Sequence, residues 1–158
     1  MTINHSIKIR TVFSLILFAF IFSTNAFAQQ TVKASDIMRD IKMGRTVSYD
    51  NVTITGILDM TFMNEKLPDL PKRKKWWKNG GSNSVKEQIE SSLSFTNCTF
   101  EDNLYAYYHD EDSEYTFVAN FENNVKFTSC TFKGEALFKY SYFEQNTDFS
   151  GSKSVSYT

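Results

Sequence analysis

Large apolar residues recur at alternating intervals of five and six positions near the carboxyl end of the chain. They are Phe127, Phe132, Phe138, Phe143 and Phe149, and a smaller residue stands two positions before each of them. Neither an α-helix nor a simple strand produces this spacing, because their side chains repeat every 3.6 and every two residues. The pattern predicts short extended sides, four to a turn, each with one small and one large side chain facing inward.

The same phase occurs twice earlier in the chain. Phe95 lies 32 residues before Phe127, which is two eleven-residue units plus ten, and Tyr49 lies 46 before Phe95, which is two units plus 24. We therefore expect three stacked turns whose strands pair in register, about 4.8 Å apart. The additional residues predict two insertions, at about 61–88 and 107–118, that leave the same side of successive turns.

Two segments carry a family resemblance. The run VKFTSCTFKGEALFKYSYFEQNTDFSGS at 125–152, with LSFTNCTF at 93–100, resembles the pentapeptide-repeat family, in particular exported members with a Phe-centred variant of the repeat. The resemblance covers about residues 47–152. It implies an all-β fold, a right-handed quadrilateral β-helix or solenoid that would occupy residues 47–158. It implies no catalytic residue, because the repeat is structural.

Both ends of such a stack need to be covered, because they expose apolar cross-sections and unpaired strands. Within residues 29–46, Ser35 followed by Ile37, Ile41 and Gly44 predicts a short capping helix that begins at a serine N-cap and ends at the glycine. At the other end the period requires a large apolar residue at Ser154. Either the polar tail folds across this end or the polypeptide is a piece of a longer solenoid, and an open end favours self-association.

The amino-terminal residues 1–28 are typical of a signal peptide. Lys8 and Arg10 precede an apolar stretch at 11–24, and Ala26-Phe27-Ala28 places small residues before a cleavage site at Gln29. We expect export to the periplasm, the cell surface or the medium. A retained membrane anchor is the alternative, although a bilayer span needs about 20 apolar residues.

Charge and chemistry narrow the function. Without the leader the chain has 15 Lys and Arg against 18 Asp and Glu, a net charge of −3, which indicates no nucleic-acid partner. Only His109 remains outside the leader, so no His-based triad, zinc site or other catalytic, metal or cofactor site is predicted. Cys98 and Cys130 occupy the same small position in successive turns; we expect two buried thiols, and a disulfide is the alternative.

The insertions provide a candidate binding surface. The first is basic, and the second is expected to form a β-hairpin with an acidic tip. Calcium binding by this tip is the alternative, but the EF-hand spacing is absent. If both insertions leave the same flank, the basic and acidic residues should lie close together. The predicted surface comprises Lys72, Arg73, Lys74, Lys75, Trp76, Trp77, Lys78, Tyr107, Tyr108, Asp110, Glu111, Asp112 and Glu114.

These features favour a non-enzymatic binding or scaffolding module, with an unidentified protein or cell-envelope component recognised on the insertion flank. Loops on one face of a repeat array usually carry its specificity. Peripheral membrane association is the alternative, because paired tryptophans among lysines suit an anionic membrane interface.

Overall fold

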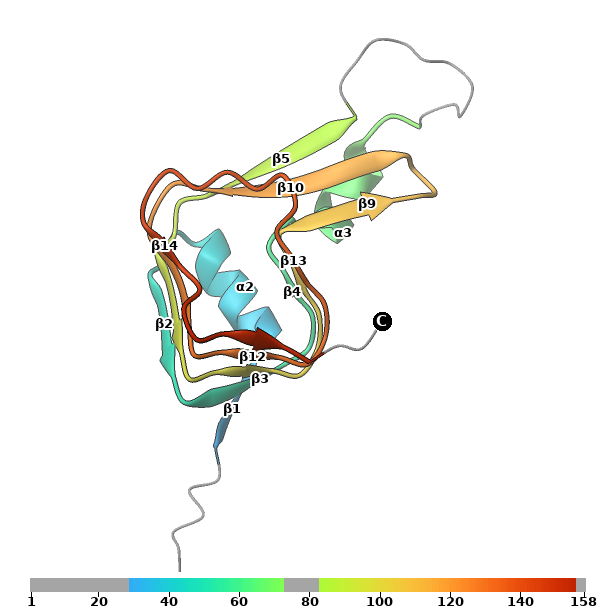
Figure 1. Ribbon diagram of the computed structural model, residues 1–158. Helices are drawn as coiled ribbons and strands as arrows, with labels where there is room; N and C mark the ends of the chain where they lie inside the picture. The colour runs from blue at the N-terminus through green and yellow to red at the C-terminus, as the bar shows by residue number, and fades with distance from the viewer. Residues whose placement is uncertain (1–28, 73–82, 156–158) are drawn as a thin grey trace, which may run out of the picture.

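The computed structural model describes residues 29–72 and 83–155, and in this part the chain is mostly β, with parallel sheets (Figure 1). The predicted leader, residues 1–28, and the basic stretch from Arg73 to Lys78 lie outside the described residues. The predicted all-β character is confirmed. Among the described residues, every strand pair is parallel except one hairpin on the insertion side.

The described strands form four sheets, three of them entirely parallel and the fourth containing the antiparallel hairpin. The first contains β1 (Gln30–Lys33), β3 (Val52–Thr55), β7 (Thr99–Phe100), β12 (Thr131–Phe132) and β15 (Lys153–Ser154). The second contains β2 (Val47–Asp50), β6 (Leu93–Thr96), β11 (Val125–Thr128) and β14 (Thr147–Asp148). The third contains β4 (Leu58–Asp59), β8 (Leu104–Tyr105) and β13 (Ala136–Leu137). The fourth contains β5 (Ser84–Ile89), β10 (Tyr115–Phe121) and β9 (Tyr107–Asp110).

The register predicted from the spacing is confirmed. Tyr49 pairs with Phe95 and Phe95 with Phe127, at the offsets of 46 and 32 residues. The aligned rings stack: the centroids of Phe95 and Phe127 are 5.0 Å apart, with an angle of 16° between the ring planes. Phe100 and Phe132 form a second stack, also at 5.0 Å. In-register pairing therefore converts a sequence period into columns of aromatic rings.

These columns form the core. Phe95, Phe100, Phe121 and Phe127 are almost completely buried. Burial of a Phe side chain contributes roughly 1.5–3 kcal/mol. Phe121 pairs with Phe143 one turn later and with Ile89 one turn earlier, so a further column begins at Ile89.

One corner of the turn recurs in a left-handed conformation. Asn51, Asn97, Ser129 and Gly151 have φ values of 55°, 53°, 55° and 68°. This region favours glycine and tolerates asparagine. Each of the first three donates its backbone N–H to a carbonyl of the next turn, as Asn97 does to Thr128 O at 2.9 Å. The neighbouring turn therefore holds each corner in place.

The predicted capping helix is present as α2 (Ala34–Lys42) and buries Ala34, Ile37 and Ile41 against β2 and β4 (Figure 1). The predicted serine cap is wrong. The helix begins one residue before Ser35, after Lys33, and has no side-chain N-cap hydrogen bond. Gly44, with φ of 67°, follows the helix end as expected.

The residues before α2 correct the predicted division of the chain. Residues 30–33 are not helix or linker but strand β1, which pairs in parallel with β3 from Gln30–Val52 to Lys33–Thr55. Gln29 joins the same edge, since its Oε1 accepts a hydrogen bond from the Thr53 hydroxyl at 3.0 Å. The chain thus adds a strand to the first sheet before it covers the core with α2.

The opposite end of the stack is uncovered by the described residues. Ser154 pairs with Phe132, at the position where the period requires a large apolar residue. Phe149 lies on Phe127 with ring centroids 5.4 Å apart and remains 37% exposed. Strands β13, β14 and β15 are each the last strand of their sheet. The uncovered end therefore combines exposed rings with strand edges.

Candidate binding surface on the insertion flank

Both insertions leave the same side of the stack and return side by side. The first leads from β4 through α3 (Met63–Lys66) and the 3-10 helix η1 (Leu67–Asp69), and returns through β5. The second is the hairpin of β9 and β10, as the sequence predicts. The returning strands β5 and β10 pair in parallel from Ser84–Thr116 to Ile89–Phe121. We call α3, η1, β5, β9 and β10 together the insertion flank (Figure 1).

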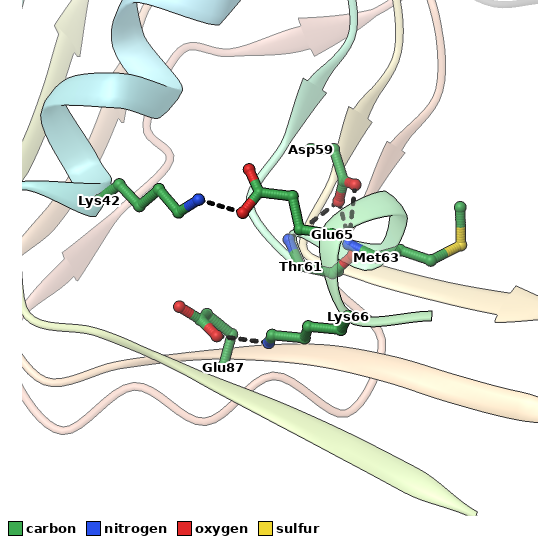
Figure 2. A network of polar contacts seen from close by, with 7 residues as sticks. All are labelled: Lys42, Asp59, Thr61, Met63, Glu65, Lys66 and Glu87. Atoms are coloured by element: carbon green, nitrogen blue, oxygen red, sulfur yellow. Dashed lines mark hydrogen bonds and ion pairs between the residues drawn. The ribbon is translucent and has the colours of Figure 1, made fainter. Parts of the chain in front are cut away.

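A buried carboxylate fixes the start of the first insertion. Asp59 Oδ1 accepts hydrogen bonds from the Thr61 backbone N–H at 2.9 Å and from the Thr61 hydroxyl at 2.6 Å. Its other oxygen accepts the backbone N–H of Met63 at 3.2 Å (Figure 2). Phe62, between them, adopts a left-handed conformation with φ of 52° and buries its ring. Asp59 thereby determines where α3 begins.

Two ion pairs connect α3 to its neighbours. Lys42 of α2 pairs with Glu65, and Lys66 pairs with Glu87 of β5 (Figure 2). The side chains of the first pair are each about half exposed, and those of the second are more buried. Pairs of this kind near the surface contribute about 0–1 kcal/mol each. Their main effect is to orient α3 between the capping helix and β5.

A cavity of about 400 Å³ lies between η1 and the hairpin tip, and we call it the proline hollow. One wall is apolar and consists of Leu67, Pro68, Leu70 and Pro71. The remaining lining is mostly polar and consists of Lys72, Asp110, Asp112, Ser113 and Tyr115. An apolar wall faced by a few polar groups is typical of ligand pockets.

Direct hydrogen bonds join the two insertions around this hollow. The Tyr115 hydroxyl donates to Pro71 O at 3.0 Å. The Asn83 side chain donates to Glu114 O at 3.1 Å, and the Thr116 N–H donates to Asn83 O at 2.9 Å. The residues on either side of the basic stretch are therefore attached to the acidic hairpin. The predicted contact between the insertions is confirmed at these residues.

The predicted site residues are distributed unevenly. Lys72, Asp110 and Asp112 line the proline hollow together. Glu111 and Glu114 belong to the turn between β9 and β10, where Glu114 has a φ of 60°. Within residues 29–72 and 83–155, no ion pair joins Lys72 to the hairpin carboxylates. The other residues predicted for this surface, from Arg73 to Lys78 and including both tryptophans, lie outside the described residues.

The two hairpin tyrosines lie on opposite faces of β9, because successive residues of a strand alternate. Tyr107 contacts Tyr140 with ring centroids 5.6 Å apart, and the Lys139 ammonium lies 5.6 Å from its centroid. Tyr108 instead contacts Tyr105, with centroids 5.3 Å apart. The predicted surface therefore has an aromatic group on each face of the hairpin.

Tyr108 also lines a second cavity, of about 350 Å³, on the side of the flank next to α2. We call it the methionine hollow. Aromatic residues Phe62, Tyr105 and Tyr108 and aliphatic residues Met38, Ile57 and Met63 line it. Asp59, Asn64 and Glu65 supply its polar groups. Sequence reasoning did not identify this hollow, because its residues come from five separate segments with no shared motif.

The reactive side chains of the described residues are few and dispersed. They contain no group of three His, Cys, Asp or Glu side chains arranged to hold a metal ion. His109 Nδ1 lies 2.9 Å from the Thr116 hydroxyl, at an exposed position on the hairpin. Cys98 and Cys130 are buried free thiols. The hydrogen bond with Cys98 and burial raise the pKa of the Cys130 thiol, so it stays protonated.

Comparisons with known proteins find no match to this chain, whether among protein-family models, curated proteins or solved structures. The resemblance to the pentapeptide-repeat family therefore depends on the segments at 93–100 and 125–152. In the part of the chain that the structure describes, no helix is long and apolar enough to cross a membrane.

Proposed function

We propose that this chain is an exported pentapeptide-repeat β-solenoid that acts as a non-enzymatic binding or scaffolding module, with recognition on the insertion flank. One observation carries the proposal: two insertions of different length and opposite charge join into one surface that encloses the proline hollow of about 400 Å³. The partner is an unidentified protein or a component of the cell envelope, reached through export by the predicted leader.

Three features support the solenoid part of the proposal. In the described chain, strands far apart in sequence pair in parallel and in register in all four sheets, and the β9–β10 hairpin is the antiparallel exception. The inward rings form columns, and the left-handed corner recurs at the same place in each turn. The resemblance to the pentapeptide-repeat family contributes the rest of the proposal, namely right-handed winding, a square cross-section and membership of that family.

The distribution of surface chemistry supports recognition on the flank. On the sheet of β2, β6, β11 and β14, by contrast, Ser94 and Lys126 form an outward-facing pair between β6 and β11, one small and one charged. The flank instead provides concave, partly apolar surface formed by loops, where specificity is usually carried. A scaffold of stacked turns would hold this surface rigidly.

Site-specific photo-crosslinking tests the proposal. A photoreactive amino acid replaces Ser113, which lines the proline hollow, or Lys126, which is exposed on β11, in the full chain expressed in its native cells. We expect a discrete protein or envelope adduct from position 113 and none from position 126. Equal adducts at both positions, or none at position 113, would contradict the proposal. Lipid adducts at position 113 would instead support the membrane alternative.

A further inference from the structure

The methionine hollow combines aromatic rings with thioethers and carboxylates. Its three aromatic residues come from three segments: Phe62 precedes α3, Tyr105 ends β8 and Tyr108 lies in β9. The rings of Tyr105 and Tyr108 are inclined by 51° with centroids 5.3 Å apart, so they form two sides of a corner rather than a stack. The negative face of an aromatic ring attracts a cation within about 6 Å of its centroid.

A cation of the protein itself already uses one of these rings. The Lys42 ammonium lies 5.7 Å from the centroid of Phe62 while it pairs with Glu65. This contact shows that the hollow's edge accepts positive charge. On the other face of the hairpin, Lys139 occupies Tyr107 in the same way, whereas no cation of the described residues lies over Tyr105 or Tyr108.

The carboxylates make the hollow electrostatically negative. Glu65 is neutralised by Lys42, but Asp59 has no ion pair within the described residues and is 9% exposed. Its oxygens accept three hydrogen bonds, all from uncharged donors of Thr61 and Met63 (Figure 2). One carboxylate charge of the hollow is therefore left for a ligand to balance.

We propose that the methionine hollow binds a small quaternary ammonium ion of the size and charge of choline. A primary ammonium needs hydrogen-bond acceptors to replace water, and the Asp59 oxygens are largely occupied. A quaternary ammonium has no N–H group and is satisfied by ring faces, thioethers and a nearby negative charge. A volume of about 350 Å³ suits such a small free ion.

This inference rests on the proposed function and deepens it, because α3 and β9 of the insertion flank form part of the hollow's lining, and it names one ligand class for the flank. The proposed function and this inference are tested by different experiments, so either can be refuted without the other. Crosslinking from position 113 reports on the proline hollow, on the other side of α3 and η1, and its result does not depend on ammonium binding.

The test uses the methionine methyl groups of the full chain, labelled with carbon-13, as reporters in an NMR titration with choline chloride. Met38 and Met63 line the hollow, whereas Met43 is exposed elsewhere and Met60 is buried. We expect saturable shifts at Met38 and Met63 only, with a dissociation constant of the order of millimolar. The neutral isostere 3,3-dimethylbutan-1-ol should bind about tenfold more weakly, because it lacks the charge.

Matched variants locate the effect. Tyr108→Leu removes a ring of the hollow and should weaken choline binding about tenfold, whereas Tyr108→Phe should retain it. Tyr142→Leu, at an exposed tyrosine that does not line the hollow, should bind choline like the wild type. Equal shifts with choline and the alcohol, no saturable shift, or unchanged binding by Tyr108→Leu would overturn the inference. Binding of phosphatidylcholine vesicles without binding of free choline would overturn it as well.

Discussion

Replacing Phe127 by Ala removes a ring from the middle of an aromatic column. Phe127 is fully buried and lies between Phe95 and Phe149, with ring centroids at 5.0 and 5.4 Å. Phe-to-Ala changes in packed cores cost about 3–5 kcal/mol, because they combine lost transfer free energy with a cavity. Domains are stable by about 5–15 kcal/mol in total. We therefore expect Phe127→Ala to lose a large part of the free energy of unfolding. The variant should still fold only if the wild type is stable by well over about 5 kcal/mol.

Phe149→Ala is the matched control, since it removes the same ring from the uncovered end of the same column. Phe149 is 37% exposed and keeps one stacked neighbour, so its loss should cost roughly half as much. Urea unfolding followed by circular dichroism measures both. With an m-value of about 1.5 kcal/mol/M, the midpoint should fall by about 2–3 M for Phe127→Ala. Equal midpoint shifts for the two variants would refute the placement of Phe127 in the interior and Phe149 at the end.

Three further predictions concern polar groups. Asp59→Asn should lower the free energy of unfolding by about 1–3 kcal/mol in urea, because hydrogen bonds of a buried carboxylate are weakened; an unchanged midpoint would contradict its role. Hydrogen bonds from Ser150 lower the pKa of Asp148, so its contribution to stability is present above the unfolded-state pKa and disappears as the pH falls through the lowered value. The stability advantage of the wild type over Asp148→Asn should therefore begin to shrink as the pH falls below the unfolded-state pKa of Asp, about 4, and a constant difference on further acidification would contradict this. Cys98 and Cys130 should resist alkylation until the chain unfolds, and rapid labelling of the native protein, or a mass indicating a disulfide, would contradict their burial as free thiols.

The register of the stack could be predicted from sequence because large and small inward residues alternate with a period that neither helices nor simple strands share. Tyr49, Phe95 and Phe127 align as their spacing requires. Both insertions were located for the same reason, since each interrupts the period at the same side. The sequence did not indicate Ile89 as an inward residue, because Glu87-Gln88-Ile89 stands where the period would have the small-x-Phe pattern. The pairing of β5 with β10 places Ile89 beside Phe121 in the core.

The candidate site was harder to predict, because its geometry depends on tertiary contacts. Asp59 gives no sequence signal for the bonds it accepts, which require the left-handed turn at Phe62. Ser35 looks like a helix cap, but β1 fixes the backbone up to Lys33 and the helix follows directly. Tyr107 and Tyr108 are adjacent in sequence and contact different neighbours, since strand alternation separates them.

The recurring corner at Asn51, Asn97, Ser129 and Gly151 has a consequence for anyone who wishes to lengthen or shorten this protein. Each corner residue sits where an ordinary side chain strains the backbone by roughly 1–2 kcal/mol, and the N–H groups of Asn51, Asn97 and Ser129 donate to carbonyls of the following turn. A grafted turn therefore needs a residue that accepts this conformation, best Asn or Gly, and a carbonyl from the next turn opposite its N–H. Turns of this chain are interchangeable modules only when they are cut and rejoined in phase with that corner.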